Sequence, residues 1–155
     1  MERNLLDKLL LIAQLLQRDM ARAFAGTVLT EARVSVLWVI QTLGPSTQQG
    51  IAAALGVSAR NISALVDALE ATGYLRRTPH PTDRRAVIVE LTATAAELMT
   101  VMQREHGEVA ATLLASVPRD DRAGFERGID AVVTRLGELV AEAEAEDAAR
   151  TEGAR

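Results

Sequence analysis

Apolar residues recur every three or four positions along most of the chain, which is the spacing of one face of an α-helix. The first such stretch covers residues 4–24, and Gly26 and Thr27 follow it as a stop. Eight of the twelve residues from Leu5 to Leu16 are leucine or isoleucine. A stripe this wide predicts either a helix that is deeply buried or a helix that packs against a second chain.

Three shorter helices are predicted between residues 30 and 72, each bounded by residue types that begin or end helices. In the last of them, Ile62, Leu65, Val66 and Leu69 fall on one face. In chain order, the three helices are bounded by Thr30 and Gly44-Pro45, by Ser46 or Thr47 and Gly56, and by Ser58 and Gly73.

The period then changes. Residues 74–78 and 86–91 are short and β-branched or aromatic, which predicts two strands joined by a polar, turn-rich connection. Thr92 can cap a long helix from residue 93 to about 114, which Pro118 breaks. A last helix follows with apolar residues at helical spacing, and from residue 141 it becomes a run of alanine and glutamate with little to bury. The fold class is therefore mainly α with a small β-hairpin.

Composition excludes several classes of protein. Hydrophobic residues make up 48% and charged residues 25% of the 155 positions, as in folded globular domains. The absence of cysteine excludes disulfides, thiolate metal sites and cysteine nucleophiles. The apolar runs are far shorter than the roughly 18–20 residues of a membrane span, and the N-terminus lacks the pattern of a signal peptide. We expect a cytoplasmic protein with no membrane partner.

The formal net charge of −4 is unevenly distributed. Residues 138–155 hold six carboxylates and two arginines, so they account for the whole net charge, and residues 1–137 sum to zero. Residues 76–85 contain four arginines and one aspartate, which gives a local charge of +3. A projecting cationic turn favours nucleic acid, although a solvated turn without a partner is the alternative.

Residues 46–92 carry the most informative pattern. Ala52 is small where two helices must approach closely, Gly56 permits a tight turn, and Ile62 anchors the second helix on the first. This spacing is typical of a helix-turn-helix, although an αα-hairpin without a nucleic-acid role would share it. The two-stranded unit that follows directly makes the segment a winged helix-turn-helix.

Several motifs resemble the MarR family of bacterial transcription regulators over about residues 30–100. The most specific is Asp83-Arg84-Arg85 followed by an apolar strand and Leu91-Thr92. The others are Thr30-Glu31-Ala32 with Leu37, then Gly56-Val57-Ser58, then Leu69 to Arg77 with Gly73-Tyr74 inside it. The resemblance implies a homodimeric regulator that binds double-stranded DNA at a palindromic operator, and we expect a repressor that a small-molecule effector releases.

The resemblance also implies roles for individual residues. The helix after Ser58 would lie in a major groove, where arginine can pair with guanine and asparagine with adenine. An arginine of the hairpin would reach a minor groove. The DNA-binding residues expected on this basis are Gln48, Gln49, Ser58, Ala59, Arg60, Asn61, Ser63, His80, Arg84 and Arg85, with Asp83 supporting the hairpin arginine.

The terminal helices have no role in the winged motif, and in the family they form a dimerisation domain. We therefore expect a dimerisation helix at 1–28, a DNA-binding domain at 29–92, dimerisation helices at 93–145 and an acidic flexible tail at 146–155. The family places its ligand between these parts, where Arg18, Phe24 and Trp38 are candidates. A tryptophan at such a position is more often simply a core residue.

Two other functions compete with DNA binding. A winged helix can serve protein interaction alone, and this is the main alternative because the predicted recognition helix carries one cation, Arg60. An enzyme is not expected, since the chain has no HExxH, no GxSxG and no glycine-rich phosphate loop. His80 and His106 are far apart and no residues have metal-ligand spacing, so neither a metal nor a cofactor is implied.

Overall fold

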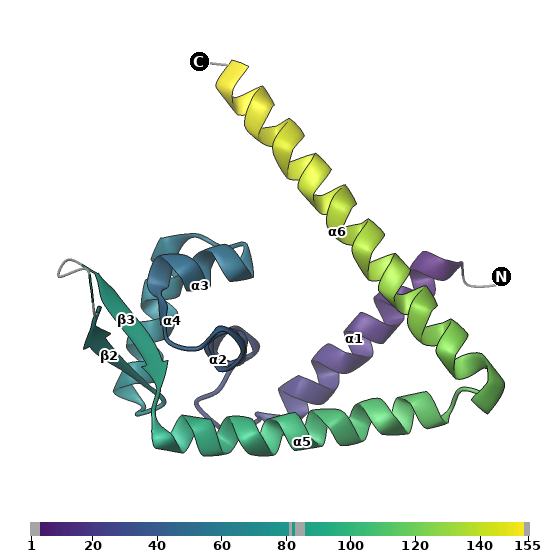
Figure 1. Cartoon of the computed structure of the whole chain (residues 1–155), viewed down its shortest axis with the longest axis horizontal. Coiled ribbons are helices and arrows are strands. Elements are labelled where there is room, and N and C mark those ends of the chain that lie inside the picture. The colour runs from purple at the N-terminus through teal and green to yellow at the C-terminus, as the bar shows by residue number, and fades with distance from the viewer. Residues whose placement is uncertain (1–3, 81, 83–85, 154–155) are drawn as a thin grey trace. The chain divides into compact units, whose positions relative to one another are not determined.

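The computed structural model describes residues 4–80, 82 and 86–153, with side chains as far as residue 150. In these residues it confirms a mainly helical chain with a small antiparallel sheet (Figure 1). The elements are α1 (Leu5–Ala23), α2 (Glu31–Leu43), β1 (Ser46–Thr47), α3 (Gln48–Leu55), α4 (Ala59–Ala71), β2 (Leu75–Pro79), β3 (Val87–Leu91), α5 (Ala93–Ala115), the 3-10 turn η1 (Arg119–Asp121) and α6 (Arg122–Gly153). The contacts divide the chain into two compact units, Met1–Gln103 and Arg104–Arg155.

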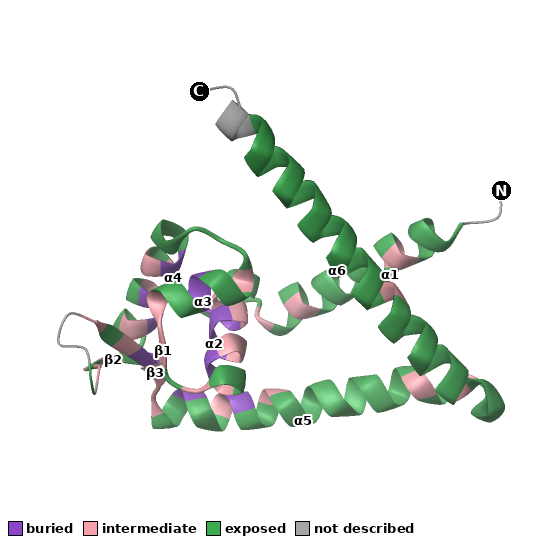
Figure 2. Cartoon of the chain, turned by 45° about the horizontal axis from the view of Figure 1, so that its top comes forward, coloured by how far each residue is buried: buried purple, intermediate pink, exposed green. Residues whose placement is uncertain are grey.

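The core of the first unit lies between α2, α3, α4 and the sheet. Leu37 of α2, Ile51 of α3 and Ile62 of α4 are completely buried, and Figure 2 shows buried residues on all three helices. Each helix presents one apolar face to the others, as the periodicity predicts. The other buried residues are Leu29, Val34, Val36, Ile40, Ala52, Val66, Leu69, Leu75, Val89, Ala95 and Met99.

The predicted caps set the ends of these helices. Thr30, Thr47 and Ser58 each accept a hydrogen bond from the backbone N–H three residues later, at 3.1 to 3.3 Å. Of the two candidates for the cap of α3, Thr47 takes the role and Ser46 does not. Gly56 ends α3 with φ of 64°, in the left-handed region that glycine adopts without steric cost. The chain can therefore turn directly from α3 into α4.

The sheet has three strands in the order β1-β3-β2, all antiparallel. The register pairs Leu75 with Leu91 and Pro79 with Val87 in the hairpin. The prediction of β2 and β3 is confirmed, but the prediction of only two strands was incomplete. β1 consists of Ser46 and Thr47, which pair with Val89 and Ile88. Two polar residues have no strand periodicity, so only their pairing with a distant segment defines β1.

Thr92 joins the base of the hairpin to the start of α5. Its backbone N–H donates to the carbonyl of Tyr74 at 3.0 Å, and its hydroxyl donates to the carbonyl of Gly73 at 2.7 Å. The same hydroxyl oxygen accepts from the backbone N–H of Ala95 at 3.3 Å, which is the predicted cap of α5. One residue therefore fixes the end of β3, the approach to β2 and the first turn of α5.

Helix α1 has the predicted length but hides none of its residues. It begins with a capping box in which Asn4 and Asp7 bond each other's backbone N–H. Leu5, Leu6 and Leu10 are 64%, 62% and 61% exposed. The alternative that α1 lies deep within its own chain is therefore wrong, and most of its apolar stripe is exposed in the described residues.

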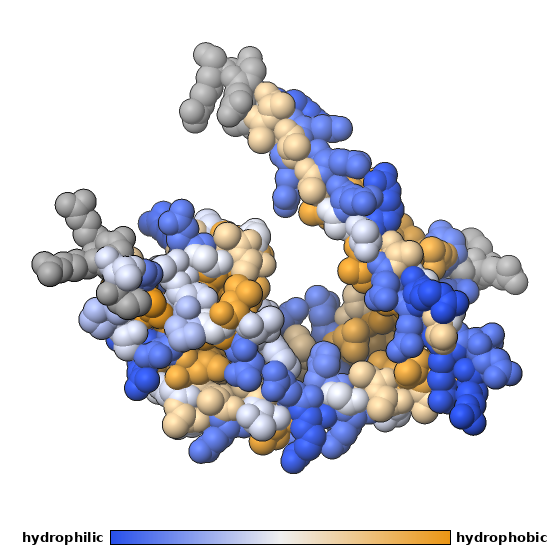
Figure 3. All heavy atoms as spheres, viewed as in Figure 1, coloured by the Kyte–Doolittle hydropathy of each residue, from blue (hydrophilic) through white to orange (hydrophobic). Residues whose placement is uncertain are grey.

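The second unit contains the end of α5, η1 and α6. Hydrophobic residues reach the surface along α6 (Figure 3), and those exposed by at least a third are Phe125, Ile129, Val133, Leu136, Leu139 and Val140. The segment expected to be a flexible acidic tail continues α6 as a helix through Gly153. Alanine and glutamate are strong helix formers, which accounts for the continuation.

In the described residues no single helix is long and apolar enough to cross a membrane. Helices α3 and α4 are together long and apolar enough for a membrane span, but the pair is bent by 114°. Both contribute buried residues to the core, including Ile51 and Ile62, and this explains their apolar composition.

Candidate nucleic-acid interface

Helix α4 has one face in the core and one face at the surface. Val66 and Leu69 are completely buried, whereas Ala59, Arg60 and Asn61 are exposed in the first turn. The cap at Ser58 holds that turn in place by bonding to the backbone N–H of Asn61. A guanidinium and a carboxamide therefore project from a rigid helix end, and both groups can make bidentate hydrogen bonds to base edges.

The remaining candidates on the helices are arranged around this turn. Ser58 is exposed and Ser63 is half-buried on α4. Gln48 and Gln49 open α3, where Gln49 is exposed and Gln48 is half-buried. The amide and hydroxyl groups can donate to phosphate oxygens.

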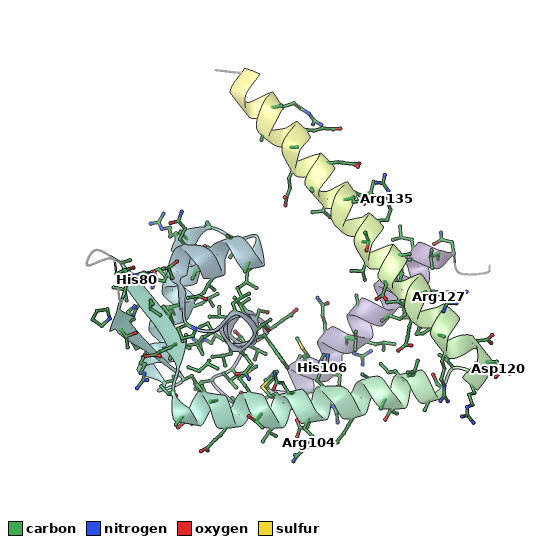
Figure 4. The ribbon with its side chains drawn as sticks, viewed as in Figure 1. His80, Arg104, His106, Asp120, Arg127 and Arg135 are labelled. Atoms are coloured by element: carbon green, nitrogen blue, oxygen red, sulfur yellow. The ribbon has the colours of Figure 1, made fainter. Side chains whose placement is uncertain are left out.

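The hairpin carries the other candidates. The backbone N–H of His80 donates to the carbonyl of Ala86 at 3.1 Å, which extends the pairing just beyond β2. The His80 Nδ1 accepts from the backbone N–H of Thr82 at 3.3 Å, so the imidazole is bonded to the turn. Figure 4 shows His80 at this end of the hairpin. Asp83, Arg84 and Arg85 lie outside the described residues.

The expectation of unopposed positive charge on the hairpin is wrong for its two described arginines. Arg76 pairs across the strands with Glu90, with 2.9 Å between Nε and Oε1. Arg77 pairs with both Asp67 and Glu70 of α4. Partners outside residues 76–85 offset both charges, and a count within that window could not include them.

Arg77, Asp67 and Glu70 form what we call the Arg77 cluster. The guanidinium of Arg77 donates to one carboxylate oxygen of each acid, and its backbone N–H donates to Glu70 Oε1 at 3.2 Å. The hydrogen bond to Asp67 is the largest cause that raises the pKa of Arg77 above its ordinary value, while desolvation opposes the shift. Arginine is charged throughout the physiological pH range in any case, so the raised pKa is a sign that both carboxylates stabilise the guanidinium.

Of the three ligand-site candidates, one lines a groove of the first unit. An open, mostly apolar groove of about 420 Å³ lies between α2 and α3 and includes Trp38. Neither Arg18 nor Phe24 lines it. Phe24 instead packs against the hydrophobic core, and Arg18 is exposed on α1. The groove is lined by Ser35, Trp38, Val39, Thr42, Leu43, Ala54 and Leu55.

No metal-binding cluster is found among the described residues. No three histidine, cysteine or acidic side chains there lie close enough together to hold a metal ion. His80 follows β2 in the first unit, and His106 lies on α5 in the second (Figure 4).

Sequence reasoning missed Asp67 and Glu70. They are three residues apart, so they share a side of α4, and the arginine that bonds them lies seven residues after Glu70. An acidic pair on a helix followed by arginine in the next strand was an available signal, but it required knowing that β2 runs back along α4.

Comparison with known families matches the model of the MarR family to residues 29–87, the segment from the end of the α1–α2 connection to the start of β3. Over these residues the chain is similar to the MarR family. The matched segment contains α2, α3, α4 and β2, so the family pattern coincides with the part of the chain that has a buried core.

Two curated relatives are named as HTH-type regulators of transcription. The HTH-type transcriptional repressor NicR of Pseudomonas putida is 36% identical over 74 residues, which are 48% of this chain and 47% of NicR. The uncharacterized HTH-type transcriptional regulator YfiV of Bacillus subtilis is 28% identical over 95 residues, 61% of this chain and 59% of YfiV. The alignments thus span about half the length of these relatives.

A solved structure shows that the fold extends beyond the matched segment. FabT of Streptococcus pneumoniae in complex with DNA superposes with a TM-score of 0.79 over 86% of this chain and 95% of FabT, at 18% identity. At this identity the likeness shows the fold, which includes helices outside residues 29–87.

Proposed function

We propose that this protein is a sequence-specific regulator that binds double-stranded DNA through α4 and the β2–β3 hairpin. The observation that carries the proposal is the exposed first turn of α4, which presents Arg60 and Asn61 while Ile62 anchors the same helix in the core. A helix held from behind with a polar N-terminal turn suits insertion into a major groove, which is about 12 Å wide. The FabT complex with DNA supports this placement by its similar fold.

The chemistry of the exposed turn suggests what is recognised. Arg60 can donate two hydrogen bonds to guanine O6 and N7, and Asn61 can bond adenine N6 and N7. Gln49 at the start of α3 and the hydroxyl of Ser58 suit phosphate oxygens. Arg85, supported by Asp83, is the hairpin residue we assign to the minor groove.

The protein acts as a homodimer in this proposal. The exposed apolar stripes of α1 and α6 are the support, because side chains such as Leu10 and Leu136 are 61% and 56% exposed. Contiguous apolar surface of this kind usually marks an interface. A two-fold dimer presents two copies of α4, so the operator is an inverted repeat with half-sites about one helical turn, or roughly 34–36 Å, apart.

We assign it the role of a repressor that a small molecule releases. The name of NicR, a repressor, supports the first part. The groove beside Trp38 supports the second, since it lies between α2 and α3 and is open to solvent. A ligand held there would contact α3 and could displace Gln49 from a phosphate.

The test is footprinting on the intergenic DNA beside the protein's own gene, followed by fluorescence anisotropy on the protected site. Arg60→Ala is expected to weaken specific binding by about 1–3 kcal/mol and to relax discrimination at one base pair. Arg104→Ala is the control, because Arg104 is exposed on α5 in the second unit and pairs only loosely with Glu108, at 3.7 Å. The absence of any protected inverted repeat would contradict the proposal.

The alternative is a winged helix for protein interaction without DNA binding. The pairing of both Arg76 and Arg77 favours it, because neither offers a free cation to a phosphate. Salt dependence separates the two functions. Binding through Z phosphates makes log K fall with log salt at a slope of roughly −0.9 Z, whereas a protein interface without phosphates lacks this slope.

A further inference from the structure

The Arg77 cluster connects the hairpin to α4, and the two elements it connects are neighbours in the sequence. Only residues 72–74 separate α4 from β2. The backbone N–H of Tyr74 donates to the carbonyl of Leu69 at 2.9 Å, which turns the chain back along the helix. The guanidinium then bonds Asp67 and Glu70, so β2 is fixed to α4 by backbone and side chain together.

The cluster also lies along the face that we assign to DNA. Asp67 follows Arg60 by seven residues, which is two helical turns, so both side chains project on the same side about 10.5 Å apart along the axis. Asp67 is 62% exposed, Glu70 is 37% exposed and Arg77 is 28% exposed. The least accessible member is the arginine, with its donors directed at protein carboxylates.

We propose that Arg77 is a positioning residue for DNA binding, which sets the hairpin relative to α4 and does not itself contact DNA. The proposal rests on the proposed function, because it assumes that α4 and the hairpin touch one duplex. The sequence alone does not distinguish Arg77 from Arg76 or Arg85. The positioning role of Arg77 is therefore argued from its hydrogen bonds to Asp67 and Glu70.

The geometry of the cluster explains why arginine is needed. A planar guanidinium donates in several fixed directions and can hold two carboxylates at once, whereas an ammonium is a single point charge. Without the arginine, Asp67 and Glu70 would leave two like charges on one side of the helix. The angle of β2 relative to α4 would change, and so would the electrostatic potential of the α4 face that carries Asp67. Arg60 and the core would stay unchanged.

The experiment is a mutant cycle on the full-length protein with the footprinted operator. Arg77→Gln is measured in the wild-type background and in a background with Asp67→Asn and Glu70→Gln, where amides can still bond one another. We expect a loss of affinity of roughly tenfold in the first background, within the range for residues of one ion-pair network, and less than about twofold in the second. Equal losses in both backgrounds would overturn the proposal.

Two further variants separate positioning from phosphate contact. Arg77→Lys should resemble Arg77→Gln if the fork geometry matters, and should resemble the wild type if Arg77 binds a phosphate. The salt slope should stay unchanged in Arg77→Gln, whereas loss of a phosphate contact would reduce its magnitude by about 0.9. Arg76→Gln is the matched control on the same strand, because Arg76 pairs within the hairpin and is 64% exposed; it should leave the angle of β2 unchanged.

A measurement without DNA keeps this proposal distinct from the proposed function. Hydrogen exchange of the β2 amides should accelerate in Arg77→Gln and not in Arg76→Gln, because the backbone N–H of residue 77 loses its ordered acceptor on Glu70. If the wild-type protein binds no DNA, the proposed function fails and so does the DNA role of Arg77. Unchanged hydrogen exchange at β2 would refute the claim that Arg77 holds β2 against α4, whatever the protein binds.

Discussion

Replacing Leu10 by serine tests whether the stripe on α1 is a subunit interface. Leu10 is 61% exposed, and complete burial of a leucine contributes about 1.5–3 kcal/mol, so covering the remainder contributes roughly 1–2 kcal/mol. A symmetric dimer contains the residue twice, which doubles the loss to about 2–4 kcal/mol. Since 1.4 kcal/mol is tenfold, the dissociation constant of the dimer should rise by about 30- to 1,000-fold.

The assay is sedimentation velocity over a concentration series, with circular dichroism to show that the helices persist. Leu43→Ser is the matched control, because Leu43 is 60% exposed but lies on α2, outside the stripe. The reasoning would be refuted if Leu10→Ser dissociated at the same concentration as the wild type, or if Leu43→Ser had an equal effect. Either result would mean that exposure of a leucine does not identify this interface.

Three other predictions concern the fold and the hairpin, and two of them include a comparison variant. Ile62→Ala should lower the free energy of unfolding by about 2–5 kcal/mol because it leaves a cavity under α4, and urea titration should show far less change for Val57→Ala, which is 42% exposed. Gly56→Ala should lower the free energy of unfolding by about 1–2 kcal/mol, because residue 56 has a positive φ. Gly107→Ala should raise it by up to about 1 kcal/mol, because Gly107 lies within α5 with open space around it. A change of the same sign in both variants would contradict the argument. Arg85→Ala should weaken operator binding in anisotropy without changing the dimer in sedimentation, and unchanged affinity would exclude it from the interface.

The helices and the hairpin could be predicted because their signals are local. Thr30, Thr47 and Ser58 cap helices within three residues of themselves, and Gly56 ends one through its own backbone. A single sequence contains all the information that such contacts need, so the predicted boundaries of the elements from α1 to α5, apart from β1, agree with the observed ones to within one or two residues.

The features that were missed all depend on partners distant in the chain. β1 exists because Ser46 pairs with Val89, and neither residue alone indicates a strand. The charges of Arg76 and Arg77 seemed unopposed because Glu90 and Asp67 lie outside the turn that was counted. Periodicity likewise predicts that α1 is a helix, but it cannot say what covers the stripe. The DNA-binding roles stay predictions for the same reason, since they depend on a partner molecule.

Thr92 has a consequence for how such a protein can change over time. The hairpin leaves the domain at Gly73 and Tyr74 and returns to the same two carbonyls through Thr92. The two ends of the hairpin are therefore held together by hydrogen bonds at its base. Residues inserted or deleted between β2 and β3 would alter the reach of the hairpin without moving the first turn of α5. Selection can thus vary the length of this hairpin independently of α5.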